Sequence, residues 1–429
     1  MRDQDSRQAA EGGPCAPAAG AAVRRPAPLR VLLDTQFGPF LAGNGLSLIG
    51  TWMQRIACSW LIWDWTHSAF WLGILAAGDL LPTVAIGPFA GVAADRWDRL
   101  KQNMLAQVVS AVLAVLTALL LATDRLGLIG LVLLITAQGA LSAAIQPARL
   151  AMIQQMVARE DMGTAVALNS VHVNLTRLLG PAVAGAMILY VDVVWIFVVN
   201  AVVTAIFVLI LARLRLAPHV KRAHSGSFFG EMRDGFVHIL RVRPLRLILL
   251  VMLCGGVMVR AMMELIPAIA AGSFADDATG LAVLTGAAAC GAVTSGLTMG
   301  RGRAAQLLQG VLWWWGLGAL AAIVLAWSRS PMLAVAAAVV MGFGITRSLV
   351  STQTFVQLTT PDALRGRVLS MHGLIARGSP ALGALVIGFA ADRVGLPHAV
   401  EVSAGALLVL LLLLAPRVRS AARGVEEAA

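Results

Sequence analysis

A short charged segment, GVAADRWDRLK at residues 91–101, separates two long apolar runs of the chain. The run before it, from about residue 37 to 94, and the run after it, from about 104 to 146, are each long enough to cross a bilayer twice. A bilayer core about 30 Å thick requires roughly 20 apolar residues per helix. The charged segment must therefore lie at a membrane surface, where its arginine and lysine side chains reach phosphates and water.

The composition extends this interpretation to the whole chain. Of 429 residues, 59% are hydrophobic and only 13% are charged, which no water-soluble domain of this size tolerates. Apolar runs of bilayer length predict an all-α integral membrane protein with twelve transmembrane helices. The predicted helices span about 36–65, 70–94, 103–123, 127–149, 163–190, 193–213, 245–270, 279–300, 305–327, 331–354, 366–391 and 397–415.

The net charge of +11 invites comparison with nucleic-acid-binding proteins, but the positions of the charges argue against such a partner. Of 33 lysines and arginines, 25 lie in the two tails and in the connections that follow the even-numbered predicted helices. Cationic residues concentrate on the cytoplasmic side of membrane proteins. We therefore expect a multi-pass membrane protein with both termini in the cytoplasm; the family resemblance given below implies that the membrane is the bacterial inner membrane.

An internal repeat divides the predicted helices into two sets. Three residues recur 200 positions later, where Ser170, His172 and Arg177 correspond to Ser370, His372 and Arg377. The repeat predicts two pseudo-symmetric six-helix bundles, and such a duplication favours a transporter whose halves rock against each other. The predicted organisation is a disordered cytoplasmic tail at 1–34, bundles at 35–213 and 245–415, a cytoplasmic linker with an amphipathic helix at 214–244, and a cytoplasmic tail at 416–429.

Seven ionisable residues are predicted to lie inside the membrane. They are Arg55, Asp79, Arg177, Arg260, Glu264, Arg347 and Arg377. Placing an arginine or aspartate at a helix centre costs about 2.5–3.5 kcal/mol on insertion scales, so such residues usually face protein or water. They are therefore the candidate functional residues of the chain.

The two acids are candidate proton-coupling residues. Arg260 and Glu264 lie four residues apart on one face of a predicted helix, where they are placed to pair directly. Such a pair is either structural or the site at which Glu264 exchanges Arg260 for a proton, because an apolar setting disfavours the charged carboxylate. Asp79 is expected to pair with a base on another helix, with Arg55 and Arg347 as the candidates, and the same two interpretations apply to it.

The balance of positive and negative charges among these residues favours one charge type of substrate. Five arginines against two acids would give a shared cavity an excess of about three positive charges. The planar guanidinium fork suits carboxylate, phosphate or catecholate oxygens, so an anionic or polyhydroxylated substrate is favoured. The alternative for Arg177 and Arg377 is a position at cytoplasmic helix ends, facing lipid phosphates.

The charged segment resembles the loop between helices 2 and 3 of the major facilitator superfamily, whose pattern is roughly G-x-x-A-D-R-x-G-R-K. The matching residues are Gly91, Ala94, Asp95, Arg96 and Arg99. Asp98 replaces the second glycine of the pattern, and the final lysine is displaced to Lys101. The resemblance implies that Gly91, Asp95, Arg96 and Arg99 belong to a loop that gates a conformational cycle.

Longer segments are similar to the enterobactin-exporter and macrolide-efflux branch of that superfamily. The similar residues are Ser47, Gly50, Trp52, Met53, Gln54, Ala57 and Trp60 in the first helix, Leu168, Asn169, Ser170, Arg177, Gly180, Pro181 and Gly185 in the fifth, and Arg365, Gly366, Arg367, Val368, Pro380, Gly383, Gly388, Ala391, Asp392 and Arg393 in the eleventh. The resemblance covers about residues 35–415 and implies export of small molecules in exchange for protons. A kink at Gly180 and Pro181 is what exporters of this superfamily tend to carry.

The chain shows no G-x-x-x-x-G-K-[ST] phosphate loop and no metal or nucleophile constellation, so neither a cofactor nor an enzymatic activity is expected. The expected partners are a small-molecule substrate, protons and membrane lipid, and nothing requires more than a monomer. The leading interpretation is a proton-coupled exporter of a small anionic or polar metabolite, with a siderophore as the first candidate. Efflux of macrolide-like or other hydrophobic drugs is the alternative among transporters, and a non-transporting membrane sensor is the alternative from another class.

Overall fold

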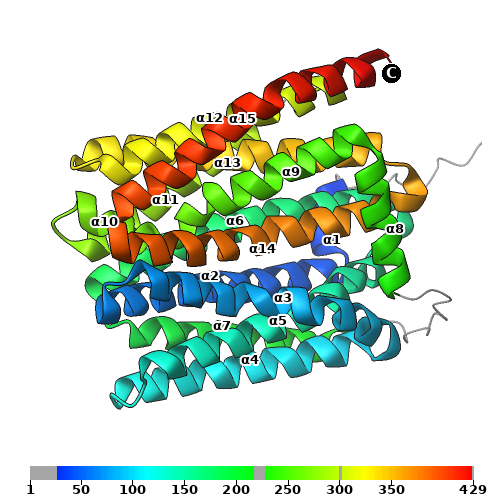
Figure 1. Ribbon diagram of the computed structural model, residues 1–429. Helices are drawn as coiled ribbons and strands as arrows, with labels where there is room; N and C mark the ends of the chain where they lie inside the picture. The colour runs from blue at the N-terminus through cyan, green and yellow to red at the C-terminus, as the bar shows by residue number, and fades with distance from the viewer. Residues whose placement is uncertain (1–26, 217–227, 299–301, 428–429) are drawn as a thin grey trace, which may run out of the picture.

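The computed structural model describes residues 27–216, 228–298 and 302–427 (Figure 1), and these residues form helices with no strand among them. The long helices are α2 (Phe37–Thr66), α3 (Ala69–Arg96), α4 (Arg99–Ala122), α5 (Leu128–Met156), α6 (Met162–Tyr190), α7 (Val194–Arg213), α9 (Arg243–Met258), α11 (Asp277–Leu297), α12 (Ala304–Trp327), α13 (Pro331–Thr359), α14 (Asp362–Val394) and α15 (Leu396–Glu427). The shorter elements are α1 (Ala27–Leu33), α8 (Phe228–Arg241), α10 (Ile266–Ser273) and the 3-10 turns η1 (Arg159–Asp161) and η2 (Arg260–Glu264).

Ten helical segments of the described residues are long and apolar enough to cross a membrane. They contain α4 to α7, α11 to α15, and the segment Arg243–Glu264. Helix α2 is long enough, but four tryptophans together with Arg55 and Asp64 reduce its apolar character. In α3 the described apolar part is Ala69–Thr83. That α2 and α3 cross the membrane therefore stays a prediction.

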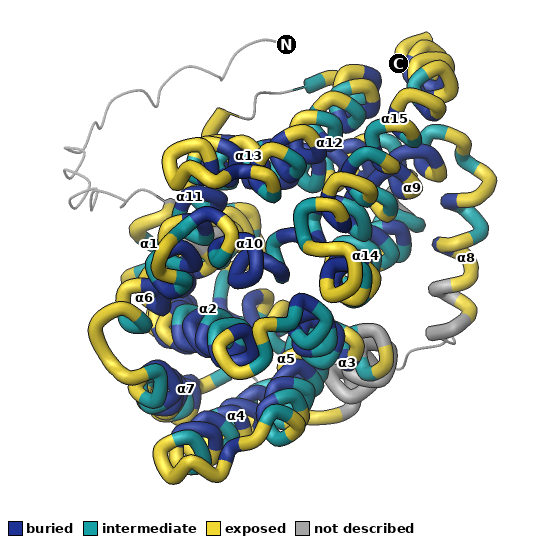
Figure 2. Tube along the Cα trace, turned by 60° about the vertical axis from the view of Figure 1, so that its left-hand side comes forward, coloured by how far each residue is buried: buried dark blue, intermediate teal, exposed yellow. Residues whose placement is uncertain are grey.

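The long helices run side by side along a common direction (Figure 1). In the first part of the chain α2 packs against α6 and α7, and α4 packs against α5 and α7. In the second part α9 packs against α14 and α15, and α12 packs against α13 and α15. The two sets meet where α3 packs along α14 and α6 along α11. The faces between helices are buried, whereas many outward leucines and valines are exposed, as expected of a surface in contact with lipid (Figure 2).

Glycines allow the two sets of helices to approach closely. A Cβ on Gly73 of α3 would lie 2.5 Å from the carbonyl oxygen of Ala384 in α14. A Cβ on Gly185 of α6 would lie 2.6 Å from the Cβ of Ala282 in α11. Both separations are shorter than an ordinary contact, so neither position accepts a larger residue without movement of the backbone. Close approach over small residues is typical of helix pairs in membranes.

The helix predicted at 245–270 is broken into three pieces. Helix α9 ends at Met258, the turn η2 follows, and α10 begins at Ile266. Pro267 lies in the first turn of α10, where its missing N–H is tolerated. Its ring disfavours a helix arriving from upstream, because it clashes with the carbonyl group four residues earlier, although α14 accommodates Pro380 in its interior. The prediction of one continuous helix is therefore wrong.

A helix occurs where the sequence predicts an amphipathic one in the linker. Helix α8 packs against α14 and α9 and lies at the side of the helix group (Figure 2). Ile239 is buried, whereas Phe236 and Leu240 are exposed. Asp234 accepts a hydrogen bond from Nη1 of Arg367 in α14 at 3.0 Å. This contact fixes α8 to the beginning of α14.

Helix α15 continues to Glu427, although the predicted helix ends at residue 415 and is followed by a tail. Val418, Ala421 and Ala422 are buried in this extension. Residues three and four positions apart share one face of an α-helix, so this spacing gives the extension an apolar face to pack. Three small apolar residues between arginines are too weak a pattern to distinguish from a tail in the sequence.

Candidate functional site

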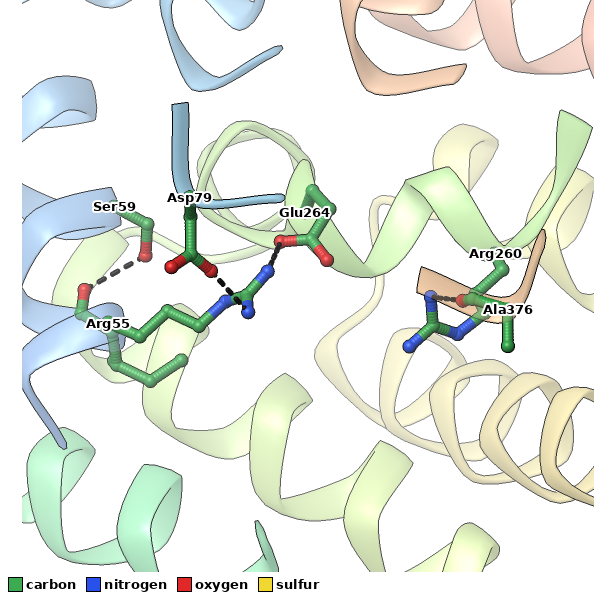
Figure 3. A network of polar contacts seen from close by, with 7 residues as sticks. Arg55, Ser59, Asp79, Arg260, Glu264 and Ala376 are labelled. Carbon is green, nitrogen blue, oxygen red and sulfur yellow. Dashed lines mark hydrogen bonds and ion pairs between the residues drawn. The ribbon is translucent and has the colours of Figure 1, made fainter. Parts of the chain in front are cut away.

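Arg55 is the centre of an ion-pair network that joins α2, α3 and η2 (Figure 3). Its Nη1 lies 2.7 Å from Oδ2 of Asp79 on α3, and its Nη2 donates to Oε2 of Glu264 in η2 at 2.9 Å. The three side chains retain 17–24% exposure, so they are only partly shielded by protein. The predicted pairing of Asp79 with Arg55 is confirmed, while the role of either acid in proton coupling stays a prediction.

The local backbone places each acid beside Arg55. A Cβ on Gly139 of α5 would lie 3.1 Å from the Cα of Asp79, so α3 and α5 touch through their backbones at this level. Glu264 ends a 3-10 turn, in which the side chains rotate by a third of a turn per residue. That turn directs Glu264 towards α2. The helix break before Pro267 is therefore what brings an acid from the second part of the chain to Arg55.

Arg260 does not pair with Glu264. Its Nη1 donates instead to the carbonyl oxygen of Ala376 on α14 at 3.0 Å (Figure 3). In a 3-10 turn residues three apart lie above one another, so residues four apart do not share a face. The predicted direct pair is wrong because it assumed α-helical spacing through this segment.

The carbonyl group that Arg260 binds is one that its own helix cannot satisfy. In an α-helix the N–H of residue i+4 donates to the carbonyl of residue i. Four residues after Ala376 comes Pro380, which has no N–H to donate. The Arg260 guanidinium supplies the missing donor and thereby joins η2 to α14.

Arg177 and Arg377 lie near the middle of α6 and α14, about 20 Å along the helix axes from the ends. The alternative position at helix ends is therefore not the one found. Both side chains are exposed, and neither forms a hydrogen bond or ion pair with the described residues. Arg177 is close enough to Arg377 and Arg55 for electrostatic repulsion, and Arg377 is close enough to Asp79 for attraction.

Trp52 connects Arg55 with Arg177. Its ring centroid lies 5.6 Å from the guanidinium carbon of Arg55 and 5.5 Å from that of Arg177, within the range of cation–π interaction. A Cβ on Gly180 would overlap the Cβ of Trp52, so α6 crosses α2 at the predicted kink of Gly180 and Pro181. The sequence places Trp52 in a group of tryptophans that favours a belt at the membrane interface, with an aromatic substrate platform as the alternative, and its contacts with two arginines on different helices leave no pattern of their own.

Six of the seven predicted intramembrane charges form one cluster. Its members are Arg55, Asp79, Arg177, Arg260, Glu264 and Arg377, which are linked by contacts or by electrostatic interaction. Four arginines against two carboxylates leave a formal excess of two positive charges. Within residues 27–216, 228–298 and 302–427, no group of three or more His, Cys, Asp and Glu side chains could hold a metal ion.

Arg347 has a different set of contacts. Its Nη1 donates to the carbonyl oxygen of Ser295, near the C-terminus of α11, at 3.0 Å. Its guanidinium carbon lies 5.4 Å from the ring centroid of Trp314 on α12. A cation beside a helix C-terminus complements the helix dipole, which is a structural role. We therefore leave Arg347 outside the cluster, and the expected excess of three charges becomes two.

The predicted gating loop is only partly visible. The side chains of Gly91, Asp95 and Arg96 lie outside the described residues. Helix α3 ends at Arg96 and α4 begins at Arg99, so the connection is very short. The carboxylate of Asp98 accepts the backbone N–H of Lys101 at 2.9 Å and thereby caps α4. The gating role of this loop stays a prediction.

Asp392 joins the two sets of helices at one end of the molecule. From the last turn of α14, its carboxylate accepts the backbone N–H of Ala69 at 2.9 Å and the hydroxyl of Ser68 at 2.5 Å. These donors begin α3, so Asp392 acts as an N-cap for a helix of the other set. At the same end, Nε1 of Trp63 on α2 donates to Oδ2 of Asp277 on α11 at 2.9 Å.

Besides its place in the family resemblance, Asp392 belongs to a repeated motif of the sequence. GFAADR at residues 388–393 repeats GVAADR at residues 91–96. The two copies end helices α14 and α3, which pack along each other. The repeat therefore singles out an aspartate near the end of each of two adjacent helices.

Long apolar helices with a charged cluster between them are typical of membrane transporters. The family model of transmembrane secretion effectors matches residues 27–427. The chain belongs to this family, which is part of the major facilitator superfamily. The resemblance of the sequence motifs to that superfamily and its efflux branch is confirmed.

Relatives of the chain transport siderophores and drugs. It is 28% identical over 152 residues to the staphyloferrin A transporter of Staphylococcus aureus, covering 35% of this chain and 38% of that protein. It is 25% identical over 393 residues to macrolide efflux protein A of Streptococcus pyogenes, covering 89% and 96%. It is 27% identical over 215 residues to the multidrug efflux pump Tap of Mycobacterium tuberculosis, covering 48% and 49%. The chain thus matches less than half of the first and third proteins.

Solved structures of transporters share the fold. A nucleoside transporter aligns with a TM-score of 0.69 at 14% identity, covering 88% of this chain and 98% of that chain. A bacterial homologue of the human lysosomal transporter Spinster aligns with a TM-score of 0.66 at 16% identity, covering 94% and 98%. At these identities the likeness concerns the fold alone.

Proposed function

We propose that this protein is a proton-coupled secondary transporter that exports a small anionic or polar metabolite by alternating access, with a siderophore as the leading candidate. The proposal places twelve spanning helices in two pseudo-symmetric bundles, α2–α7 and α9–α15, in the bacterial inner membrane with both termini cytoplasmic. Membership in a family of transporters supports transport over a sensor or an enzyme. The observation that carries the proposal is the sharing of Arg55 between Asp79 and Glu264.

The shared arginine provides a way to couple protons to movement. Arg55 and Asp79 belong to the first proposed bundle and Glu264 to the second. While Glu264 is charged, its attraction to Arg55 holds the bundles together at this level. A proton that binds Glu264 removes that charge and breaks the ion pair between the bundles. Arg55 stays paired with Asp79 while Glu264 is protonated. If Glu264 gains its proton from outside and releases it into the cytoplasm, proton entry drives the return of the carrier.

The charge of the cluster supports an anionic substrate. Two positive charges remain uncompensated in an environment where a lone charge is costly. Guanidinium groups bind carboxylate and phosphate through paired hydrogen bonds. A substrate of negative charge would therefore be stabilised at the cluster, and a lipophilic cation would be repelled.

Efflux of macrolide-like or other hydrophobic drugs is the second candidate. The alignment with macrolide efflux protein A, which covers 89% of this chain, favours it. The two candidates respond differently to loss of positive charge at the cluster. Replacing Arg177 or Arg377 by Gln should abolish export of an anion but leave efflux of a cationic drug largely intact.

The decisive experiment is mass spectrometry of spent medium and cell extracts from a deletion strain and its parent, with and without iron starvation. We expect one iron-chelating metabolite to disappear from the medium and to accumulate in the mutant cells. The wild-type gene should restore export, and a gene carrying Glu264→Gln should not. If exported chelators are unchanged while the mutant becomes sensitive to macrolides, the second candidate replaces the first.

A further inference from the structure

Arg177 and Arg377 differ from the other arginines of the cluster because neither forms a hydrogen bond or ion pair with the part of the chain that the structure describes. Arg55 is held by two carboxylates, and Arg260 is held by a carbonyl oxygen. Arg177 and Arg377 are exposed near the middle of their helices and form no hydrogen bond or ion pair with the described residues. They are also close enough to repel each other.

This arrangement is unfavourable unless something binds there. The positive charges of Arg177 and Arg377 repel each other, and the attraction of Arg377 to Asp79 leaves the excess of positive charge in the cluster uncompensated, which is costly within a membrane. A structural arginine acquires a partner from the protein, as Arg260 and Arg347 do. Two equivalent arginines, one from each copy of the internal repeat, whose N–H groups donate to no acceptor among the described residues, are instead the pattern of a binding site.

We propose that Arg177 and Arg377 form an anion clamp that binds a carboxylate-bearing substrate between α6 and α14. The excess of two positive charges in the cluster matches a substrate with two carboxylates. Planar guanidinium groups bind carboxylates through two parallel hydrogen bonds each. Trp52 holds Arg177 against its ring and so limits the positions that this guanidinium adopts.

The clamp also explains how binding would favour closure. This step rests on the proposed transport function, in which α6 and α14 belong to different bundles. A dicarboxylate held at both ends replaces repulsion between the bundles by attraction to a common ligand. With Glu264 deprotonated, only an occupied clamp would then allow the bundles to approach, whereas the empty carrier returns with a proton on Glu264, so protons do not enter without export of substrate.

Binding of glutarate to the purified full-length protein tests the clamp. Glutarate carries two carboxylates, and glutaramide is its uncharged analogue of nearly equal size. We expect glutarate, but not glutaramide, to raise the unfolding temperature of the wild-type protein in a concentration-dependent manner. Arg177→Gln and Arg377→Gln should each weaken the apparent affinity by about tenfold or more, because a charge-assisted pair of hydrogen bonds is lost.

Arg347→Gln is the matched control, since it removes a partnered arginine from a helix of the second set. It should leave the apparent affinity for glutarate unchanged. A second readout separates binding from a structural role. Without ligand, Arg177→Gln and Arg377→Gln should raise the unfolding temperature by relieving repulsion, whereas loss of a structural arginine would lower it.

Several results would overturn the clamp. The clamp is wrong if glutarate does not bind the wild type, or if glutarate and glutaramide raise its unfolding temperature equally. It is also wrong if both arginine variants retain the wild-type affinity for glutarate, or if inorganic phosphate stabilises the protein and glutarate does not. The outcome is separable from that of the export experiment. If glutarate binds as expected while a deletion strain exports every metabolite normally, the clamp stands and the proposed transport function fails.

Discussion

Arg55 satisfies two acids at once, so its removal has consequences that a single pair would not have. Arg55→Gln leaves Asp79 and Glu264 as unpaired charges close to each other. Loss of one partner from a buried pair costs about 3–5 kcal/mol, and the 17–24% exposure of these side chains reduces that cost. We expect a clear fall in the unfolding temperature and loss of coupled transport.

The additional replacement of both acids tests this explanation. The triple variant Arg55→Gln, Asp79→Asn, Glu264→Gln carries no uncompensated charge at these positions and should recover most of the lost stability without recovering transport. Arg367→Gln, which breaks the exposed pair with Asp234, is the control and should lower the unfolding temperature far less. Failure of the triple variant to regain stability would show that Arg55 acts through packing and not through charge.

Arg260 and Pro380 are expected to depend on each other. Arg260→Ala removes the donor that satisfies the carbonyl of Ala376 and should cost about 1–3 kcal/mol. Pro380→Ala restores a backbone N–H at the position that normally donates to that carbonyl. The loss caused by Arg260→Ala should therefore be much smaller in the Pro380→Ala background. Thermal unfolding of the four proteins measures the coupling, and strictly additive effects would contradict it.

At the scale of the helix, Asp392 caps α3 across the boundary between the two sets. Asp392→Ala removes the acceptor for Ser68 and for the N–H of Ala69. Loss of an N-cap costs about 1 kcal/mol. Because the cap spans the boundary, we expect the loss to widen this end of the molecule as well as to lower stability.

Spin labels can measure that opening in a background without the native cysteines. Labels at Tyr190 and Met332, which are 84% and 83% exposed, report the separation between α6 and α13. Asp392→Ala should shift their distance distribution towards longer values. Labels at Tyr190 and Asp124, within one set of helices, should show no shift. An unchanged distribution for the first pair would mean that the cap does not hold this end closed.

Two glycine-to-alanine substitutions distinguish the effect of tight helix packing on stability from the effect of helix propensity. Gly73→Ala should be strongly destabilising, since its Cβ would lie 2.5 Å from a carbonyl oxygen of α14. Gly286 of α11 has no atom within 4 Å of its Cβ position, so Gly286→Ala should be neutral or stabilising by up to about 1 kcal/mol. Thermal unfolding of the two variants checks the contrast, and equal effects would remove the argument for close packing of α3 on α14.

At the scale of the whole molecule, patterns among neighbouring residues predicted only the features that depend on residues close together in the chain. Apolar runs predicted most helices closely, as in 193–213 for Val194–Arg213, and arginines and acids inside those runs predicted ionisable residues within the helix group. The pair of Arg55 and Glu264 joins residues 209 positions apart, and no pattern within one helix reveals it. Pro267 did signal a break, but the long apolar run around it favoured one helix.

The unpaired arginines of the clamp have a consequence for membrane voltage. A site with two excess positive charges is drawn towards the negative interior of an energised cell, at about 2.3 kcal/mol per charge for a full crossing at 100 mV. The empty carrier would therefore rest with its site directed towards the cytoplasm, where the cargo is made. A doubly charged anion cancels that force once it binds, so the loaded carrier turns outward electrically neutral, and only the empty return is driven by the potential.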